Sequence, residues 1–270
     1  MNWKKLQNGS DIRGVALEGI EGEHVNLTPE VIETIAKSFV RWIRNNSDCE
    51  TPTIAVGMDC RLSGSSIKSA FVKGAVEAGA NVVDCGLAST PAMFMTTISE
   101  HVKATASVMV TASHLPFNRN GLKFFTPKGG LDSKDIASIL TIAENGEFAF
   151  EGAKGSSSTL DFMDIYSRHI ADYIREGVNA DDYQHPLKGM HIIVDAGNGN
   201  GGFFEKILSM LGADTKGSQF LDPDGRFPNH IPNPEDREAM ASVCKAVEES
   251  DADLGVIFDT DVDRSAIIGR

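Results

Sequence analysis

The sequence predicts an α/β protein made of two similar units, and three observations support this fold class. Helix and strand patterns alternate along most of the 270 residues, which is typical of α/β folds. The stretch 145–159 is rich in Gly, Ser and Ala and has no periodicity, which indicates a connection between domains. The parts on either side repeat one order of elements, so we expect domains at 1–150 and 151–270.

The first half begins with a well-marked helix. Thr28 supplies a capping hydroxyl and Pro29 occupies the first turn. Val31, Ile35 and Phe39 then recur at helical spacing. The further elements expected in this half are a strand at 53–57, a helix at 63–78, a strand at 81–85, a helix opening at Thr90, strands at 106–110 and 122–125, and a helix at 133–144.

The second half has the same character. The elements expected here are a helix at 160–175, a strand at 191–195, a tight glycine turn at 197–202, a helix at 203–211, a strand at 214–220, a proline-rich loop, a helix at 235–250, and strands at 254–258 and 265–268. The glycine turn lacks the Lys-Ser/Thr of a P-loop and the spacing of a dinucleotide fingerprint.

In each half, an apolar strand is followed by a polar loop, which begins at Thr111 in the first half and at Asp259 in the second. Ligands of such sheets lie beyond the carboxyl ends of strands, so these loops are the candidate sites.

Composition excludes several classes of protein. At 41% hydrophobic and 23% charged, the chain is ordinary globular material. No apolar run is long enough to span a bilayer, and the N-terminal residues lack the hydrophobic stretch of a secretory signal. A net charge of −13 disfavours nonspecific nucleic-acid binding and anionic membrane surfaces. The four cysteines have no zinc spacing and read as reduced thiols, so we expect a cytoplasmic protein, with an organelle stroma still possible.

Three carboxylates at alternate positions, Asp259, Asp261 and Asp263, predict a divalent cation site. In an extended segment they would lie on one side, and oxygen ligands suit Mg²⁺ or Ca²⁺ rather than zinc. An EF-hand is excluded because Arg264 and Arg270 stand where that loop needs glycine and glutamate. The alternative is an acidic solvated turn, but three like charges directly after a buried strand have little structural use.

Ser113 is the candidate nucleophile or phosphoryl carrier. A hydrolytic pair with His114 is disfavoured, because adjacent residues of an extended loop point apart and no G-x-S-x-G elbow is present. A phosphoserine needs cationic partners, and His114, Arg119 and Lys123 are near in sequence. A plain turn between strands is the alternative. Arg13, in a glycine-flanked loop, is either a solvated surface residue or a phosphate fork.

Four segments together resemble the α-D-phosphohexomutase superfamily of phosphoglucomutases, phosphomannomutases and phosphoglucosamine mutases. They are Ile12-Arg13-Gly14, the serine segment 111–123, the loop 222–234, and the acidic segment 259–264. Leu115 stands where the family usually has asparagine, and Thr260 and Val262 replace the usual glycines of its magnesium loop.

The resemblance implies two similar three-layer α/β/α domains with mixed sheets, which correspond to phosphohexomutase domains 1 and 2. It also implies that domains 3 and 4 of the family are absent, because the chain stops after the metal loop of the second domain. The implied catalytic residues are Ser113, Lys123 and His114, with Lys123 as general acid/base and His114 in support. Arg13 and Arg264 are implied phosphate partners. The implied cofactor is Mg²⁺, held by Asp259, Asp261, Asp263 and a phosphoserine oxygen of Ser113.

The expected activity is intramolecular phosphoryl transfer on hexose phosphates, through a phosphoserine and a hexose bisphosphate intermediate. For the chain alone we expect weak Mg²⁺ binding and little or no turnover, with domains 3 and 4 as its partners in the full-length protein. The alternatives are a noncatalytic metal-binding α/β module, a metal-dependent phosphatase, and phosphoglucosamine mutase as a substrate variant.

Overall fold

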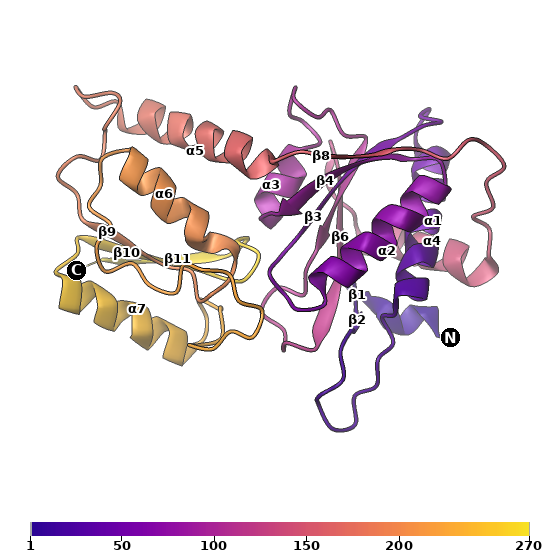
Figure 1. The fold of residues 1–270 in the computed structure, drawn as a ribbon, viewed down its shortest axis with the longest axis horizontal. Helices are drawn as coiled ribbons and strands as arrows, with labels where there is room; N and C mark the ends of the chain where they lie inside the picture. The colour runs from indigo at the N-terminus through magenta and orange to yellow at the C-terminus, as the bar shows by residue number, and fades with distance from the viewer. Residues whose placement is uncertain (1, 270) are drawn as a thin grey trace. The chain divides into compact units, whose positions relative to one another are not determined.

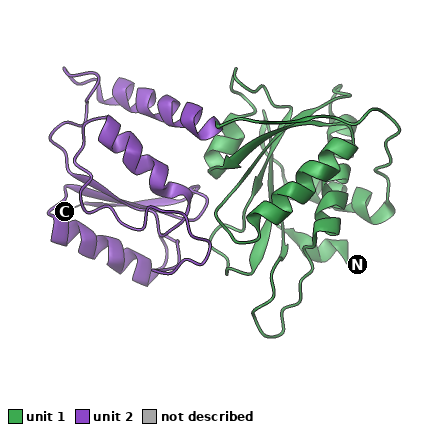
Figure 2. Ribbon diagram, in the orientation of Figure 1, with its two compact units in different colours: residues 1–161 green, residues 162–270 purple. Residues whose placement is uncertain are grey.

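A computed structural model describes residues 2–269. The chain forms two compact units, residues 1–161 and 162–270, which are coloured separately in Figure 2. The division lies at 161/162, eleven residues beyond the expected boundary at 150/151. Within residues 2–269, every helix is too short or too polar to cross a membrane.

The first unit is built on one mixed sheet of eight strands. The strand order is β1-β2-β6-β5-β3-β4-β8, and β7 pairs with β6. Strand β3 runs parallel to β4 and β5, and β4 runs parallel to β8, whereas β6 is antiparallel to β5 and β2. The strands are β1 (Gln7–Asn8), β2 (Asp11–Val15), β3 (Thr53–Met58), β4 (Asn81–Leu87), β5 (Ala106–Val110), β6 (Arg119–Thr126), β7 (Gly129–Gly130) and β8 (Ser157–Thr159). Because β3 and β5 are parallel neighbours, the loops that follow them lie at the same edge of the sheet.

Helices cover both faces of this sheet (Figure 1). Helices α1 (Pro29–Asn46), α2 (Gly64–Glu77) and α4 (Ser133–Asn145) pack on one face, and the short α3 (Thr90–Met95) packs on the other. The core under α1 and α2 contains three buried phenylalanines, Phe39, Phe71 and Phe124. Their ring centroids lie between 4.6 and 6.5 Å apart, a range in which aromatic pairs attract one another.

Side-chain caps fix the helix starts that the sequence predicts. Thr28 Oγ1 accepts from the Val31 N–H at 3.4 Å, and Pro29 is the first residue of α1. Asp132 and Asp135 form a capping box at the start of α4. Such caps satisfy backbone N–H groups that have no partner within the helix.

The second unit has a smaller sheet of three strands, in the order β11-β10-β9. Strands β9 (Ile192–Asp195) and β10 (Leu254–Phe258) are parallel, and β11 (Ser265–Gly269) is antiparallel to β10. Helices α5 (Phe162–Val178) and α6 (Phe203–Met210) lie on one side of the sheet and α7 (Arg237–Ser250) lies on the other (Figure 1). Ile192 and Val194 pack toward α6, whereas Ile193 packs toward α7. This is the predicted three-layer arrangement.

Three segments differ from the prediction. Arg13 lies in strand β2 instead of a loop; this short strand exists because β6, about 105–110 residues further along the chain, supplies its hydrogen-bonding partner. Residues 157–159, predicted as linker, form the edge strand β8 beside β4 although all three are exposed. The segment 214–220 makes two isolated bridges instead of a continuous strand, from Asp214 to His191 just before β9 and from Gln219 to Asp195 at the end of β9. A turn at Gly217, with φ of +99°, interrupts it. Two 3₁₀ turns, η1 (Trp3–Leu6) and η2 (Asn200–Gly202), complete the elements that the structure describes.

Candidate active site

The serine loop, residues 111–119, follows β5 at the carboxyl edge of the first sheet. Ser113 is 7% exposed, its N–H donates to Thr111 Oγ1 at 2.8 Å, and its Oγ lies 3.4 Å from His114 Nδ1. Ser113 has a φ of +52°, a left-handed conformation that costs a non-glycine residue roughly 1–2 kcal/mol. Such strain persists where the surrounding structure holds it, and it is common at functional sites.

A buried arginine contacts the backbone of this loop. Arg61, between β3 and α2, donates to the carbonyl oxygens of Ser113, Leu115, Pro116 and Arg119. Its Nε lies 3.3 Å from Asp59 Oδ2, and both side chains are fully buried. Sequence reasoning missed this pair. The available signal was Asp-x-Arg directly after the predicted strand 53–57, at the edge where ligands and their supports gather.

Arg13 and Lys123 lie on the same face of the first sheet, in the strands β2 and β6. Arg13 pairs with Gly121 in the β2–β6 ladder, and Lys123 is two residues further along β6, so their side chains share a face. Arg13 donates to the Thr111 carbonyl at 2.6 Å and to Asp11 Oδ2 at 2.7 Å. The structure thus brings Arg13 into contact with the first residue of the serine loop. Lys123, in β6, is partly buried.

The other two candidate phosphate partners near Ser113, His114 and Arg119, have different surroundings. His114 is exposed to solvent. Arg119 forms an ion pair with Glu23, and its Nε lies 3.1 Å from Glu23 Oε2. Asn118 Nδ2 donates to the same Glu23 oxygen at 2.8 Å. Arg119 therefore joins the serine loop to the segment that precedes α1.

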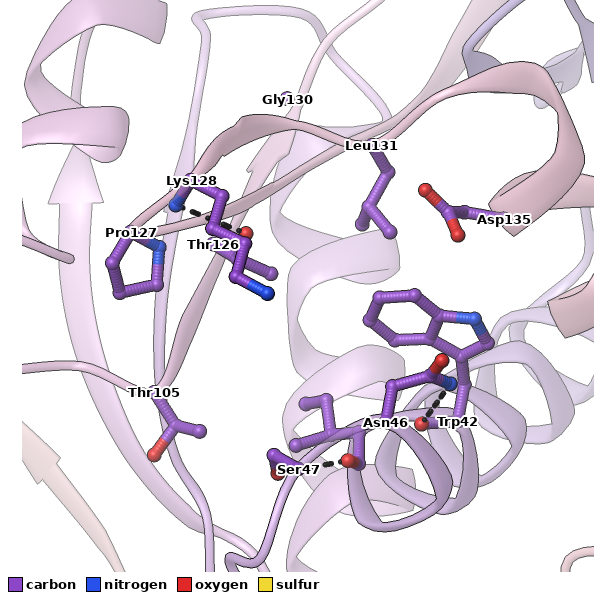
Figure 3. A pocket seen from close by; sticks show the side chains of 11 residues that line it. Trp42, Asn46, Ser47, Thr105, Thr126, Pro127, Lys128, Gly130, Leu131 and Asp135 are labelled. Atoms are coloured by element: carbon purple, nitrogen blue, oxygen red, sulfur yellow. Dashed lines mark hydrogen bonds between the residues drawn. The ribbon is translucent and has the colours of Figure 1, made fainter.

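A cavity of about 540 Å³ lies at the opposite edge of the same sheet (Figure 3). Trp42, Ile43 and Leu131 form its apolar part, and Thr105 and Asp135 are among its polar lining residues. Thr105 precedes β5, whereas Ser113 follows that strand. The cavity is therefore separate from the serine loop.

The acidic trio, Asp259, Asp261 and Asp263, follows β10 at the carboxyl edge of the second sheet. One oxygen from each carboxylate lies within 4.8 Å of the others. Asp259 and Asp261 are fully buried and Asp263 is exposed. Buried like charges at this separation favour a bound cation, and a set of oxygen ligands alone suits Mg²⁺. The residues fit a hard divalent cation.

A turn assembles the trio, so the expectation of an extended segment was wrong. Asp259 Oδ1 accepts from the N–H groups of Asp263 and Arg264, each at 3.1 Å. Val262 has a φ of +64°, which is rare for a β-branched residue. The turn folds the chain back on Asp259, and this brings the three carboxylates together although they do not alternate along a strand.

Arg264 lies against the trio. Its Nη2 is 3.3 Å from Asp259 Oδ2, and its Nη1 is 3.8 Å from Glu235 Oε2. The Arg264 side chain is 30% exposed, so it balances part of the negative charge while solvent still reaches it.

The glycine turn at 197–202 packs tightly against the acidic loop. A Cβ at Gly199 would lie 2.9 Å from Thr260 Cα, and one at Gly202 would lie 2.2 Å from Leu221 O. The Asn200 N–H donates to the Thr260 carbonyl at 2.9 Å. The interpretation of this segment as a tight turn is confirmed, and its glycines are needed for close approach.

Comparison with known proteins identifies the class to which this fold and these loops belong. The family described as phosphoglucomutase/phosphomannomutase, α/β/α domain I, matches residues 4–150, and its domain II matches residues 165–270. The chain belongs to the phosphoglucomutase/phosphomannomutase family, and the predicted fold class is confirmed.

Individual relatives agree with this assignment. A phosphoglucomutase of Neisseria meningitidis serogroup B is 32% identical over 96% of the chain and 52% of its own length. A phosphomannomutase of Salmonella typhimurium is 35% identical over 92% of the chain and 52% of its length. The crystal structure of a family member from Burkholderia thailandensis superposes with a TM-score of 0.76 at 27% identity, covering 97% of this chain and 54% of the other. The chain therefore spans about half the length of the relatives it matches.

Proposed function

We propose that this chain carries the phosphoserine and metal-binding parts of a phosphohexomutase. The observation that supports this most is Ser113, a nearly buried serine held in a left-handed conformation at the carboxyl edge of a sheet, in a chain of this family. Its relatives bear the names phosphoglucomutase and phosphomannomutase. The proposed substrates are accordingly hexose phosphates, with a hexose bisphosphate as intermediate.

In the proposed reaction, Ser113 Oγ carries the phosphoryl group. A hydroxyl of the hexose phosphate attacks phosphorus, the bond to Ser113 Oγ breaks, and a hexose bisphosphate forms. The bisphosphate reorients and returns its other phosphoryl group to Ser113 Oγ, so the protein ends as it began. We propose Lys123 as the general acid/base that takes the proton of the attacking hydroxyl and returns it to the leaving oxygen. His114, whose Nδ1 lies 3.4 Å from Ser113 Oγ, supports it.

Asp259, Asp261 and Asp263 are the proposed protein ligands of Mg²⁺, with an oxygen of the phosphoryl group on Ser113 as a further ligand. When bound, the ion neutralises charge on the phosphoryl oxygens. Arg13 and Arg264 are the proposed phosphate contacts. A guanidinium has five N–H donors, so each arginine can keep its protein contacts and still bind a phosphate oxygen.

A mass measurement tests the phosphoserine. Incubating the chain with α-D-glucose 1,6-bisphosphate and Mg²⁺ should add about 80 Da, one HPO₃ group, to the intact protein. Peptide mapping should place it on Ser113, and Ser113→Ala should abolish it. Absence of any increment on the wild-type chain would contradict the proposal and favour a noncatalytic metal-binding module. Rapid loss of the increment to water, with inorganic phosphate as product, would favour a metal-dependent phosphatase.

For the chain by itself, we propose weak Mg²⁺ binding and little or no sustained turnover of hexose phosphate. A coupled assay for glucose 1-phosphate to glucose 6-phosphate conversion tests this. Turnover at a rate of about 10 per second, typical of whole enzymes, would contradict it. Repeating the assay with mannose and glucosamine phosphates would separate phosphomannomutase and phosphoglucosamine mutase activity from phosphoglucomutase activity.

A further inference from the structure

We infer that Arg61, neutralised by Asp59, is a positioning residue that sets the backbone of the serine loop; its meaning for catalysis rests on the proposed function. The two terminal nitrogens of Arg61 donate to four carbonyl oxygens within seven residues of chain. Nη2 contacts Ser113 O and, at 2.6 Å, Leu115 O. Nη1 contacts Pro116 O at 2.7 Å and Arg119 O at 3.1 Å. No part of the Arg61 side chain is exposed.

The Asp59 carboxylate fixes the guanidinium from the other side. Asp59 Oδ2 lies 3.3 Å from Arg61 Nε, and Asp59 Oδ1 accepts from the Arg61 N–H at 3.0 Å. The Asp59 N–H in turn donates to the Val110 carbonyl at 3.0 Å, at the end of β5. The pair is therefore tied to both parallel strands, β3 and β5, from whose ends the two loops emerge. A charge this deeply buried needs such a partner.

These contacts decide which way the loop peptides face. All described peptide bonds are trans, so the N–H of each peptide points away from its carbonyl. Because the Ser113 and Pro116 carbonyls point at Arg61, the N–H groups of His114 and Phe117 point away from it. Arg61 thereby holds the peptide on the carboxyl side of Ser113 in one orientation and stabilises the left-handed backbone of that residue.

An arginine is needed for this contact pattern. Its planar group presents donors in a fixed fork, whereas a lysine concentrates three donors on one nitrogen. A lysine at 61 keeps the charge opposite Asp59 but cannot span carbonyls from Ser113 to Arg119. Arg61→Lys is therefore the informative variant, and Arg44→Lys is its matched control. Arg44, also in the first unit, donates to the carbonyls of Glu50 and Ala78, away from the serine loop.

Two measurements on the whole chain test the inference. In amide hydrogen exchange, Arg61→Lys should speed exchange at Leu115 and Arg119 by about tenfold or more, with α1 unchanged, because the N–H groups of these two residues donate within the loop to Ala112 O and Pro116 O and local opening becomes easier. In the phosphorylation assay, α-D-glucose 1,6-bisphosphate is the phosphoryl donor. At saturating donor, the phosphorylation rate of Arg61→Lys should be about a hundredfold below that of the wild type, since small displacements of a reacting group have effects of this size. The donor concentration for half-maximal rate should change less than about threefold. Arg44→Lys should match wild type in both measurements.

The outcomes are distinguishable. Wild-type exchange at Leu115 and Arg119 in folded Arg61→Lys would overturn the inference, as would an unchanged phosphorylation rate. If Arg61→Lys does not fold, the double variant Asp59→Asn/Arg61→Gln removes both charges together, and the same exchange measurement decides. If the wild-type chain takes up no phosphate while exchange still rises in Arg61→Lys, the proposed function fails and the loop-holding role of Arg61 stands.

Discussion

His230 and Asp195 form a buried pair in which both ring nitrogens of the histidine lie within hydrogen-bond distance of an oxygen. Nε2 lies 3.0 Å from Asp195 Oδ1, and Nδ1 lies 2.9 Å from the Ile231 carbonyl oxygen. Donation from both ring nitrogens requires the protonated ring, so this arrangement favours the imidazolium form. Asp195 ends β9, and His230 lies in the proline-rich loop. The pair therefore fastens that loop to the carboxyl edge of the second sheet.

This pair should make the stability of the second unit depend on pH. Burial of the ring acts to lower the pKa of His230, but the hydrogen bond with Asp195, the Ile231 carbonyl and the charges of Asp195 and Asp236 together raise it above its ordinary value. A raised folded-state pKa contributes stability that is complete below the unfolded value of about 6.5 and is lost as pH rises through the folded value. Urea unfolding between pH 5.5 and 9 should show this loss.

A pair of variants isolates the contribution. His230→Gln should destabilise the second unit by about 3–5 kcal/mol at pH 6, because it breaks a buried ion pair, and should flatten the pH dependence. His185→Gln is the control: His185 pairs with Asp182 on the surface, both side chains about half exposed, so it should cost less than about 1 kcal/mol. Equal effects of the two substitutions would contradict the assignment.

Gly121 should be intolerant of any side chain. A Cβ at this position would lie 2.1 Å from the Ile12 carbonyl oxygen and 2.7 Å from Arg13 Cδ. We expect Gly121→Ala to destabilise the first unit by about 3 kcal/mol through backbone displacement and to disturb the contact of Arg13 with Thr111. Gly130→Ala is the matched control, since its nearest neighbour would lie at 3.8 Å. Thermal unfolding with the same midpoint for both variants would refute this.

Most helices and strands could be predicted from local sequence patterns, because each of these elements is specified mainly by its own residues. The 3.6-residue period with Thr28 and Pro29 gave α1, and the apolar run at 106–110 gave β5. Strands β2 and β8 escaped prediction because their stability comes from partners distant in sequence, β6 and β4. The acidic trio could be predicted from residue type and spacing, but its turn could not, since Val262 at φ of +64° contradicts local preference.

The residues that hold the site in place were harder to predict than the residues proposed to carry out its chemistry. Ser113, His114 and Lys123 stand in one segment whose residue types indicate phosphoryl transfer. Arg61 is 52 residues from Ser113 in the chain, and only the parallel pairing of β3 with β5 brings them together. The same holds for Asp195 and His230, whose contact depends on how the proline-rich loop returns to β9.

The acidic trio should lower the stability of the second unit without metal and raise it when Mg²⁺ binds. Without metal, Asp261→Asn should raise the stability of the second unit by about 1–2 kcal/mol, because it removes one of two buried like charges at close range. Mg²⁺ should stabilise the wild type by about 2.7 kcal/mol at a hundredfold excess over Kd and should have little effect on Asp261→Asn. Asp224→Asn, an equal charge change in the proline-rich loop, should leave the Mg²⁺ shift intact. Thermal unfolding with and without Mg²⁺ measures both effects, and a full Mg²⁺ shift in Asp261→Asn would contradict the metal assignment.

The backbone strain at Ser113 should be measurable by comparing the variants Ser113→Ala and Ser113→Gly, which both lack the hydroxyl. Ser113→Ala keeps the left-handed conformation unfavourable, whereas Ser113→Gly relieves it at the cost of extra freedom in the unfolded chain. We therefore expect the glycine variant to be more stable than the alanine variant by about 0.5–1 kcal/mol in urea unfolding, which reverses the usual order of these residues. Neither variant should take up phosphate. At Ser107, an ordinary strand position with negative φ whose Oγ donates to Met93 O, alanine should be the more stable of the two. The usual order at position 113 would mean that the loop relaxes in solution and that Ser113 is not held in the conformation described above.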